Sequence, residues 1–119
     1  MKIAVQGQII DTDTIYSISE EVYENNNNYF FDIICFNDHA IEVSIHTKDR
    51  TNNKAHNELT LLRQTAGTNA TDEQMVMYNT LLKKIPIENK NKIEKMRQDI
   101  VNIWSNNQSV IPTFDIKKY

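Results

Sequence analysis

Cysteine, glycine and proline are scarce in this chain of 119 residues, with one, two and two copies respectively. A single cysteine, Cys35, cannot form a disulfide within the chain or the multi-cysteine site of a zinc domain. Two glycines are too few for the phosphate loops of Rossmann and Walker proteins. No apolar run approaches the ~20 residues that span a bilayer, and residues 1–7 lack the apolar stretch of a signal peptide. We therefore expect a cytoplasmic protein with no membrane partner.

Charge is unevenly distributed along the chain, although the net charge is only −3. Residues 1–50 contain nine acidic and three basic side chains, whereas residues 51–119 contain seven acidic and ten basic ones. The largest local excess lies in residues 83–97, with six basic and two acidic side chains. Such an excess favours an anionic partner near this segment. The length predicts a single domain over residues 1–119.

The first half of the chain has the pattern of short antiparallel strands. Asn-rich and Gly-containing turn signals separate runs that are rich in β-branched and aromatic residues. The last run alternates cleanly, with Ile41, Val43 and Ile45 on one face. The connections are too short for crossovers, so we expect an N-terminal antiparallel β-meander over about residues 2–47. Its predicted strands cover residues 2–6, 9–11, 14–23, 29–36 and 40–47.

The second half has helical periodicity, which makes the predicted fold class α+β. We expect three helices, over about residues 54–66, 71–85 and 88–105. Gly67 is placed to end the first, and the capping box Thr71-Asp-Glu-Gln74 opens the second. Pro86 is expected to stop the second helix or start the third. The apolar stripes of the long helices are wider than one small sheet covers, which favours a homodimer through helix faces.

Residues that could carry catalysis or bind a metal have no productive spacing. Cys35 lies in an apolar strand, where a thiol is usually a small core residue. His39, His46 and His56 lie in a turn, a strand and a loop without metal-ligand spacing. We therefore expect a protein that is not an enzyme, with no catalytic residues, no metal site and no cofactor.

An anion site is the better candidate, and the third predicted helix supplies its residues. At 100° per residue, Lys90, Arg97 and Trp104 line one flank of the apolar stripe. Arg97 offers a fork for a phosphate, and Trp104, about 10.5 Å further along the axis, offers a face for a base. Arg63 is a further bidentate donor among the candidate ligand-binding residues, as is Arg50. The same pattern also fits a Trp104 in the core with Arg97 lying along its edge.

The remaining lysines of the basic segment are expected on a solvated helix face: Lys83, Lys84, Lys92 and Lys95. Binding of duplex DNA is disfavoured because the chain is acidic overall and lacks the short glycine turn of a helix-turn-helix. An alternative function uses the acidic first half. Glu20, Glu21, Glu24 and Asp38 could imitate a phosphate track for a basic host protein, as a direct inhibitor or adaptor of the anti-CRISPR type would.

The size, the sheet of residues 2–47, the helices of residues 54–105 and a helix with Arg97 and Trp104 resemble the phage-encoded sponges that sequester nucleotide immune signals, the Thoeris anti-defence proteins. This resemblance implies a small homodimer that holds a cyclic ADP-ribose-type signal with aromatic and Arg side chains. The many Asn, Ile and Lys residues are typical of AT-rich genes, including those of phages and mobile elements. We therefore expect a phage or mobile-element accessory protein that sequesters a small phosphate-bearing nucleotide.

Overall fold

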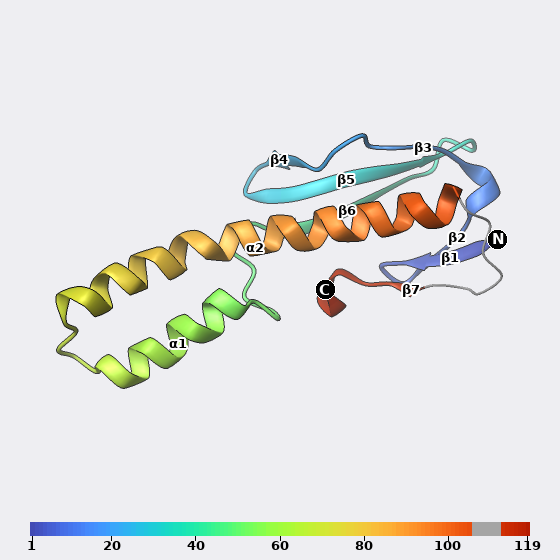
Figure 1. Ribbon diagram of the computed structural model, residues 1–119. Helices are drawn as coiled ribbons and strands as arrows, with labels where there is room; N and C mark the ends of the chain where they lie inside the picture. Colours follow the sequence, from blue (N-terminus) through green and yellow to red (C-terminus); the bar gives the residue numbers. More distant parts are fainter. Residues whose placement is uncertain (106–112) are drawn as a thin grey trace.

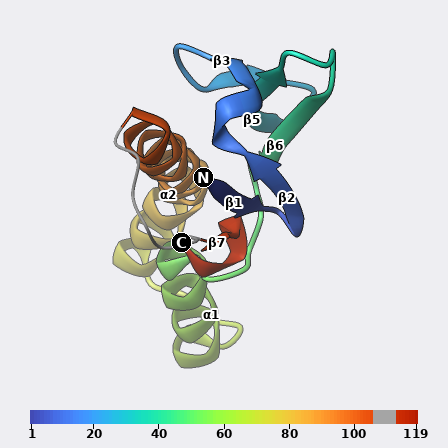
Figure 2. The same cartoon turned by 90° about the vertical axis from the view of Figure 1, so that its right-hand side faces the viewer.

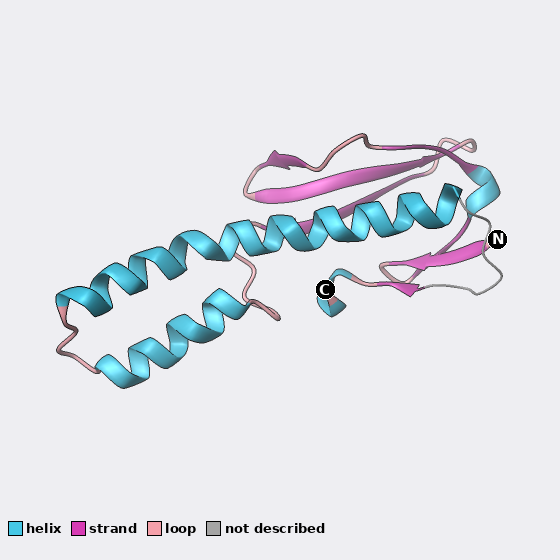
Figure 3. Cartoon of the chain, in the orientation of Figure 1, coloured by secondary structure: helices cyan, strands magenta, loops and turns pink. Residues whose placement is uncertain are grey.

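The computed structural model describes residues 1–105 and 113–119, and it has the expected α+β fold. The strands gather at one end of the molecule, where half of the long helix runs alongside them, and the rest of the helical structure extends from the other end (Figure 3). The strands are β1 (Lys2–Val5), β2 (Gln8–Asp11), β3 (Ile15–Ile18), β4 (Tyr23–Asn25), β5 (Asn28–Cys35), β6 (Ala40–His46) and β7 (Thr113–Phe114). The helices are α1 (Lys54–Ala66) and α2 (Asp72–Ser105), with the short 3₁₀ turns η1 (Thr12–Thr14) and η2 (Ile116–Lys118).

The larger sheet is built around β5, with β6 on one edge and β3 and β4 sharing the other. The strand predicted over residues 14–23 is therefore two strands. The ladder is already irregular between Ile15 and Ser17, and Ser19 then bonds the backbone of Asp32 through its hydroxyl. The β4–β5 hairpin turns at Asn26 and Asn27, which both have positive φ angles of 51° and 64°. Asparagine tolerates this conformation, as the Asn-rich turn signal predicts.

The smaller sheet has the order β2-β1-β7, and β7 runs parallel to β1. The β1–β2 hairpin turns at Gln6 and Gly7, whose φ angles are 50° and 78°. The sequence also predicts an extended tail over residues 110–116, in which Pro112 permits at most an edge strand. Pro112 itself lies outside the described residues. β7, which follows directly, occupies an edge of the sheet (Figure 1).

The helices predicted over residues 71–85 and 88–105 are one continuous helix, α2, and the prediction of a break at Pro86 is wrong. A proline inside a helix removes one backbone hydrogen bond and bends the axis, at a cost of about 3 kcal/mol. Packing on both sides offsets that cost: Leu81 and Ile85 are buried against α1, and Ile93 is buried in the main core. The axis bends near the middle of the helix (Figure 1).

The main hydrophobic core lies between the two sheets and the C-terminal half of α2 (Figures 1 and 2). Its α2 residues Ile93, Met96 and Ile100 are fully buried. The N-terminal half of α2 extends beyond the sheets and pairs with α1 around a second, small core of Ala55, Leu59, Leu81 and Ile85. This helical hairpin makes the molecule elongated, with extents of 58 × 28 × 20 Å.

Candidate functional site

Arg97, the first predicted phosphate ligand, connects α2 to the chain between β3 and β4. Its Nε donates a hydrogen bond to the backbone oxygen of Ser19. The cavity of about 230 Å³ that Arg97 lines is also lined by Glu20, Glu21 and Glu94. Carboxylates around a guanidinium repel a phosphate, so the three glutamates disfavour the binding of an anion in this cavity.

Trp104 and Lys90 do not line the cavity of Arg97 in the described part of the chain. Trp104 is half-buried and packs against the main core. Lys90 is exposed, with its Nζ 3.9 Å from a carboxylate oxygen of Glu94. The three residues therefore share a helix but not a common pocket.

The other lysines of the basic segment differ in their surroundings. Lys95 is exposed as expected and forms an ion pair of 2.8 Å with Asp99. Lys92 is buried, so its expected place on a solvated face is wrong. Its Nζ donates to the backbone oxygens of Thr51 and Asn52, which holds the loop between β6 and α1 against α2.

Arg63 lies on α1, in the helical hairpin and not beside Arg97. Its guanidinium covers the ring of Tyr78, 5.1 Å from the ring centre, and donates a hydrogen bond to the tyrosine hydroxyl. This cation–π contact fixes the long side chain at the junction of α1 and α2. Arg63 therefore belongs to a different site from the other predicted ligands.

Arg63 lines a cavity of about 540 Å³ between the β6–α1 loop, α1 and α2, which we call the basic cavity. Its cationic side chains come from all three segments, with Lys48 and Arg50 from the loop, Arg63 from α1 and Lys83 from α2. The remaining lining residues are His56, Leu59, Asn79, Leu82, Ile85 and Pro86. None of the described acidic residues lines it.

The four cations of the basic cavity have no carboxylate partner within ion-pair distance among residues 1–105 and 113–119. Like charges gathered around one opening repel each other, and a bound anion relieves that repulsion. The apolar lining residues can in addition contact an uncharged part of the same ligand. The volume lies within the range of about 300–1,000 Å³ typical of small-molecule sites.

A buried amide pair positions the loop that carries Lys48 and Arg50. Asn89 on α2 is fully buried, and its amide donates to the backbone oxygens of Thr47 and Asp49 at 3.0 and 2.9 Å. Its side-chain oxygen accepts from the amide of Asn53, the N-cap of α1. The loop is thus bonded at both ends to the middle of α2.

Glu88 adds a second connection between α2 and the start of α1. Its carboxylate oxygens accept from the backbone N–H groups of Lys54 and Ala55 at 2.6 and 3.3 Å. A carboxylate at a helix N-terminus satisfies free N–H groups and the helix dipole. This contact fixes α1 relative to α2 and so fixes the walls of the basic cavity.

Sequence reasoning missed Lys48, Arg50, His56, Asn79 and Lys83 as members of one site. One signal could have separated Lys83 and Arg63 from the other helical cations, because neither has an acidic residue three or four positions away. Lys90, Lys92 and Lys95 each have such a neighbour and form ion pairs of 2.8–3.9 Å. Unpaired cations are the ones free to meet a ligand.

Comparison with protein-family models, curated proteins and solved structures finds no match for this chain. Within the described residues, no three His, Cys, Asp or Glu side chains come together as a metal site would require. Nor is any helix of residues 1–105 and 113–119 long and apolar enough to cross a membrane.

Proposed function

We propose that this protein binds a small phosphate-bearing nucleotide in the basic cavity and sequesters it without chemical change. The observation that carries the proposal is the convergence of four unpaired cations, from a loop and two helices, on one cavity of ligand size. The proposed ligand class is the one expected in the sequence analysis, a nucleotide signal of the cyclic ADP-ribose type. The site is different: Arg63 is retained, whereas Arg97, Trp104 and Lys90 lie elsewhere.

The chemistry of the cavity suits such a ligand. Arg50 and Arg63 can each give two parallel hydrogen bonds to a phosphate, and the lysines supply further positive charge. Leu59, Leu82 and Pro86 offer apolar contacts to a base or ribose. The cavity contributes charge and surface, which supports binding and not turnover. In a phage or mobile-element setting, removal of a signal from the cytoplasm of a bacterial host would counter a defence that depends on it.

A thermal-shift screen with cyclic ADP-ribose, ADP-ribose, cyclic dinucleotides and inorganic pyrophosphate tests the proposal. A ligand that binds only the native state raises the melting temperature by mass action, by several degrees at about 100 times its Kd. Adenosine, which lacks phosphate, should give no shift. Calorimetry then gives the affinity of each positive compound.

Charge-removing variants locate the site. Arg50→Gln and Lys83→Gln each remove an exposed cation of the basic cavity, and each should weaken binding about tenfold or more, since a charge-assisted hydrogen bond contributes roughly 1.5–3 kcal/mol. Lys90→Gln removes the same charge outside the cavity and should leave the affinity unchanged. Loss of binding in Arg97→Ala with retention in Arg50→Gln would return the site to the face predicted from sequence. A screen without any shift would contradict the function itself.

The second candidate function is that of an inhibitor or adaptor that binds a host protein. Its binding surface would be the outward face of the larger sheet. Asp32 and Glu42 are paired on neighbouring strands of this face, and like charges placed opposite each other destabilise a sheet. Exposed Tyr16 and Phe36 contact each other edge to face nearby, at 5.3 Å between ring centres. Acidic and aromatic side chains together suit a basic protein partner. If this face is the functional one, Glu42→Lys abolishes counter-defence activity and Arg50→Gln does not.

A further inference from the structure

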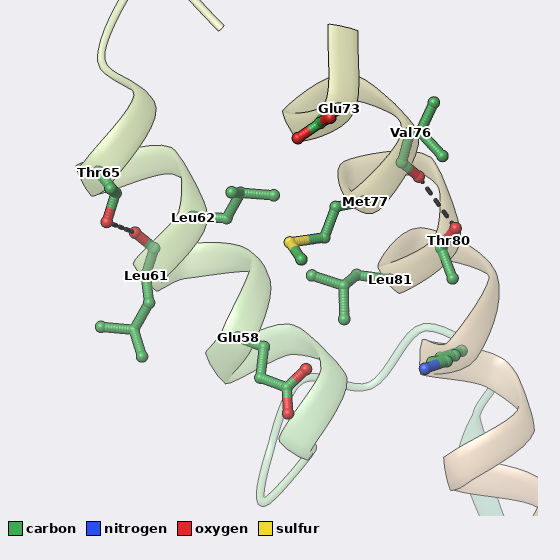
Figure 4. Close-up of a pocket in the computed structure, with 10 residues that line it drawn as sticks. Glu58, Leu61, Leu62, Thr65, Glu73, Val76, Met77, Thr80 and Leu81 are labelled. Carbon is green, nitrogen blue, oxygen red and sulfur yellow. Dashed lines mark hydrogen bonds between the residues drawn. The ribbon is translucent and has the colours of Figure 1, made fainter. Parts of the chain in front are cut away.

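We infer that a second copy of this chain covers an apolar groove on the face of the α1–α2 hairpin opposite the basic cavity. The groove has a volume of about 670 Å³ and is framed by both helices (Figure 4). Leu62, Met77 and Leu81 point into the space between the helices, as Figure 4 shows. The apolar side chains of this face are exposed, its hydroxyl groups are paired within the chain, and its charges on α2 complement those of a second copy.

The groove carries large apolar side chains that remain open to solvent. Leu61, Val76 and Met77 are 62%, 67% and 56% exposed, although all three lie on well-formed helices. The radius of gyration is 18.0 Å, against about 13.5 Å for a compact chain of this length. The hairpin that carries the groove therefore projects from the main body with one apolar face uncovered.

The two hydroxyl groups of the groove already have hydrogen-bond partners within the chain. The hydroxyls of Thr65 and Thr80 donate to the backbone oxygens of Leu61 and Val76, each at 2.9 Å (Figure 4). A partner can cover these threonines without leaving an unpaired donor, which would cost about 1–3 kcal/mol. The charged lining residues Glu58, Glu73 and Lys84 are the first or last of their helix's lining residues, so the stretch between them is uncharged.

The charges on the α2 side of the groove are complementary in a two-fold packing, although the spacing of the residues is that of any helix stripe. Its lining residues are placed in pairs around a midpoint between positions 78 and 79: Glu73 with Lys84, Val76 with Leu81, and Met77 with Thr80. In an antiparallel two-fold packing, each residue faces its counterpart on the other copy. Every apolar residue then meets an uncharged residue, and Glu73 of each copy meets Lys84 of the other.

The α1 lining residues are also placed in pairs at this level of the hairpin, although Glu58 of each copy meets a threonine and not an opposite charge. Glu58 and Thr65 are symmetric about a midpoint between Leu61 and Leu62. The contact between Arg63 and Tyr78 places this midpoint within about a helical turn of the one on α2. One two-fold axis therefore serves both helices. The resulting four-helix packing buries both grooves and leaves both basic cavities, on the opposite faces, open.

Sedimentation velocity or light scattering over a concentration series tests this inference. The wild-type chain should dimerise in the micromolar range, and Val76→Glu should weaken the dimer by about 100-fold or more, because it places an unpaired charge in the interface. Ile87→Glu is the matched control, since Ile87 is 59% exposed on the same helix but does not line the groove. It should leave the dimer intact, and circular dichroism should show both variants folded.

Charge exchange tests the antiparallel geometry itself. Glu73→Lys and Lys84→Glu should each weaken the dimer, because each places like charges opposite one another twice in the complex. The double variant should restore it. A wild-type chain that stays monomeric at 100 µM (on the order of a hundredfold above the expected Kd), a dimer that tolerates Val76→Glu, or a double variant no better than the single ones would each overturn the inference. None of these outcomes depends on whether a nucleotide binds.

Discussion

Asn53 and Asn89 are 36 positions apart in the sequence, yet both are fully buried and their amides hydrogen bond to each other at 3.0 Å. Asn53 also donates to the backbone oxygen of Ile85, one residue before the proline of α2. Together, Asn53 and Asn89 connect the N-terminus of α1, the loop before it and the bend of α2. The geometry of the basic cavity depends on this buried pair.

Asn89→Leu should destabilise the fold and weaken ligand binding together. The variant leaves the backbone oxygens of Thr47 and Asp49 without their donor, and we expect a loss of about 2–4 kcal/mol in the free energy of unfolding. Urea denaturation measures this loss. Asn91→Leu, two positions along on the exposed surface of α2, is the control and should stay within about 0.5 kcal/mol of wild type. Equal effects of the two substitutions would argue against the network.

Pro86→Ala should stabilise the protein. Alanine supplies the missing N–H group inside α2 and has a far better helix propensity, whereas loss of the proline frees the unfolded chain by about 0.4–1 kcal/mol. We expect a net gain of about 1–2 kcal/mol. The straighter helix should also change ligand affinity, because Pro86 lines the basic cavity. A drop in melting temperature would mean that the bend is required by the packing on both sides of it.

The contact of Tyr119 with Asp99 should make stability depend on pH at both extremes. Burial, with the hydrogen bond to Asp99, raises the pKa of Tyr119 above its ordinary value of 10.0. The folded tyrosine then keeps its proton longer than the unfolded one, so stability is full below pH 10 and falls as the pH rises above it. Burial also raises the pKa of Asp99, but hydrogen bonds from Lys95 and Tyr119 lower it more, to a net value below 3.8. Stability therefore also falls as the pH drops below about 4.

Tyr119→Phe provides the check on this pH dependence. The free energy of unfolding of the variant, measured at a series of pH values, should decline less steeply above pH 10 than that of wild type. Lys95 still bonds Asp99 in the variant, so part of the acid dependence should remain. Identical alkaline profiles for the two proteins would contradict the assignment.

Local patterns allowed much of the fold to be predicted from the sequence. The alternation in residues 40–47 is seen as buried Ile41, Val43 and Ile45, and α1 has its predicted bounds. The capping box is formed, with Thr71 and Gln74 each accepting from the other's backbone N–H. These features depend on neighbours within a few residues, which the sequence displays directly.

The failures share a physical cause, since each depends on contacts between distant segments. Pro86 lies inside a helix because packing on both sides offsets its cost, and Lys92 is buried because loop carbonyls accept from its amino group. The basic cavity brings Lys48 beside Lys83 only through the loop that Asn89 holds. No periodicity or spacing in the sequence encodes these contacts.

One helix of about 51 Å belongs to both hydrophobic cores, because the 34 residues of α2 run through the small core and into the main one. Unfolding of the hairpin would therefore also disturb α2, the helix that packs against the sheets. We therefore expect the two cores to unfold together, so that occupation of the hairpin by a ligand or a second chain should slow hydrogen exchange in the distant sheet as well.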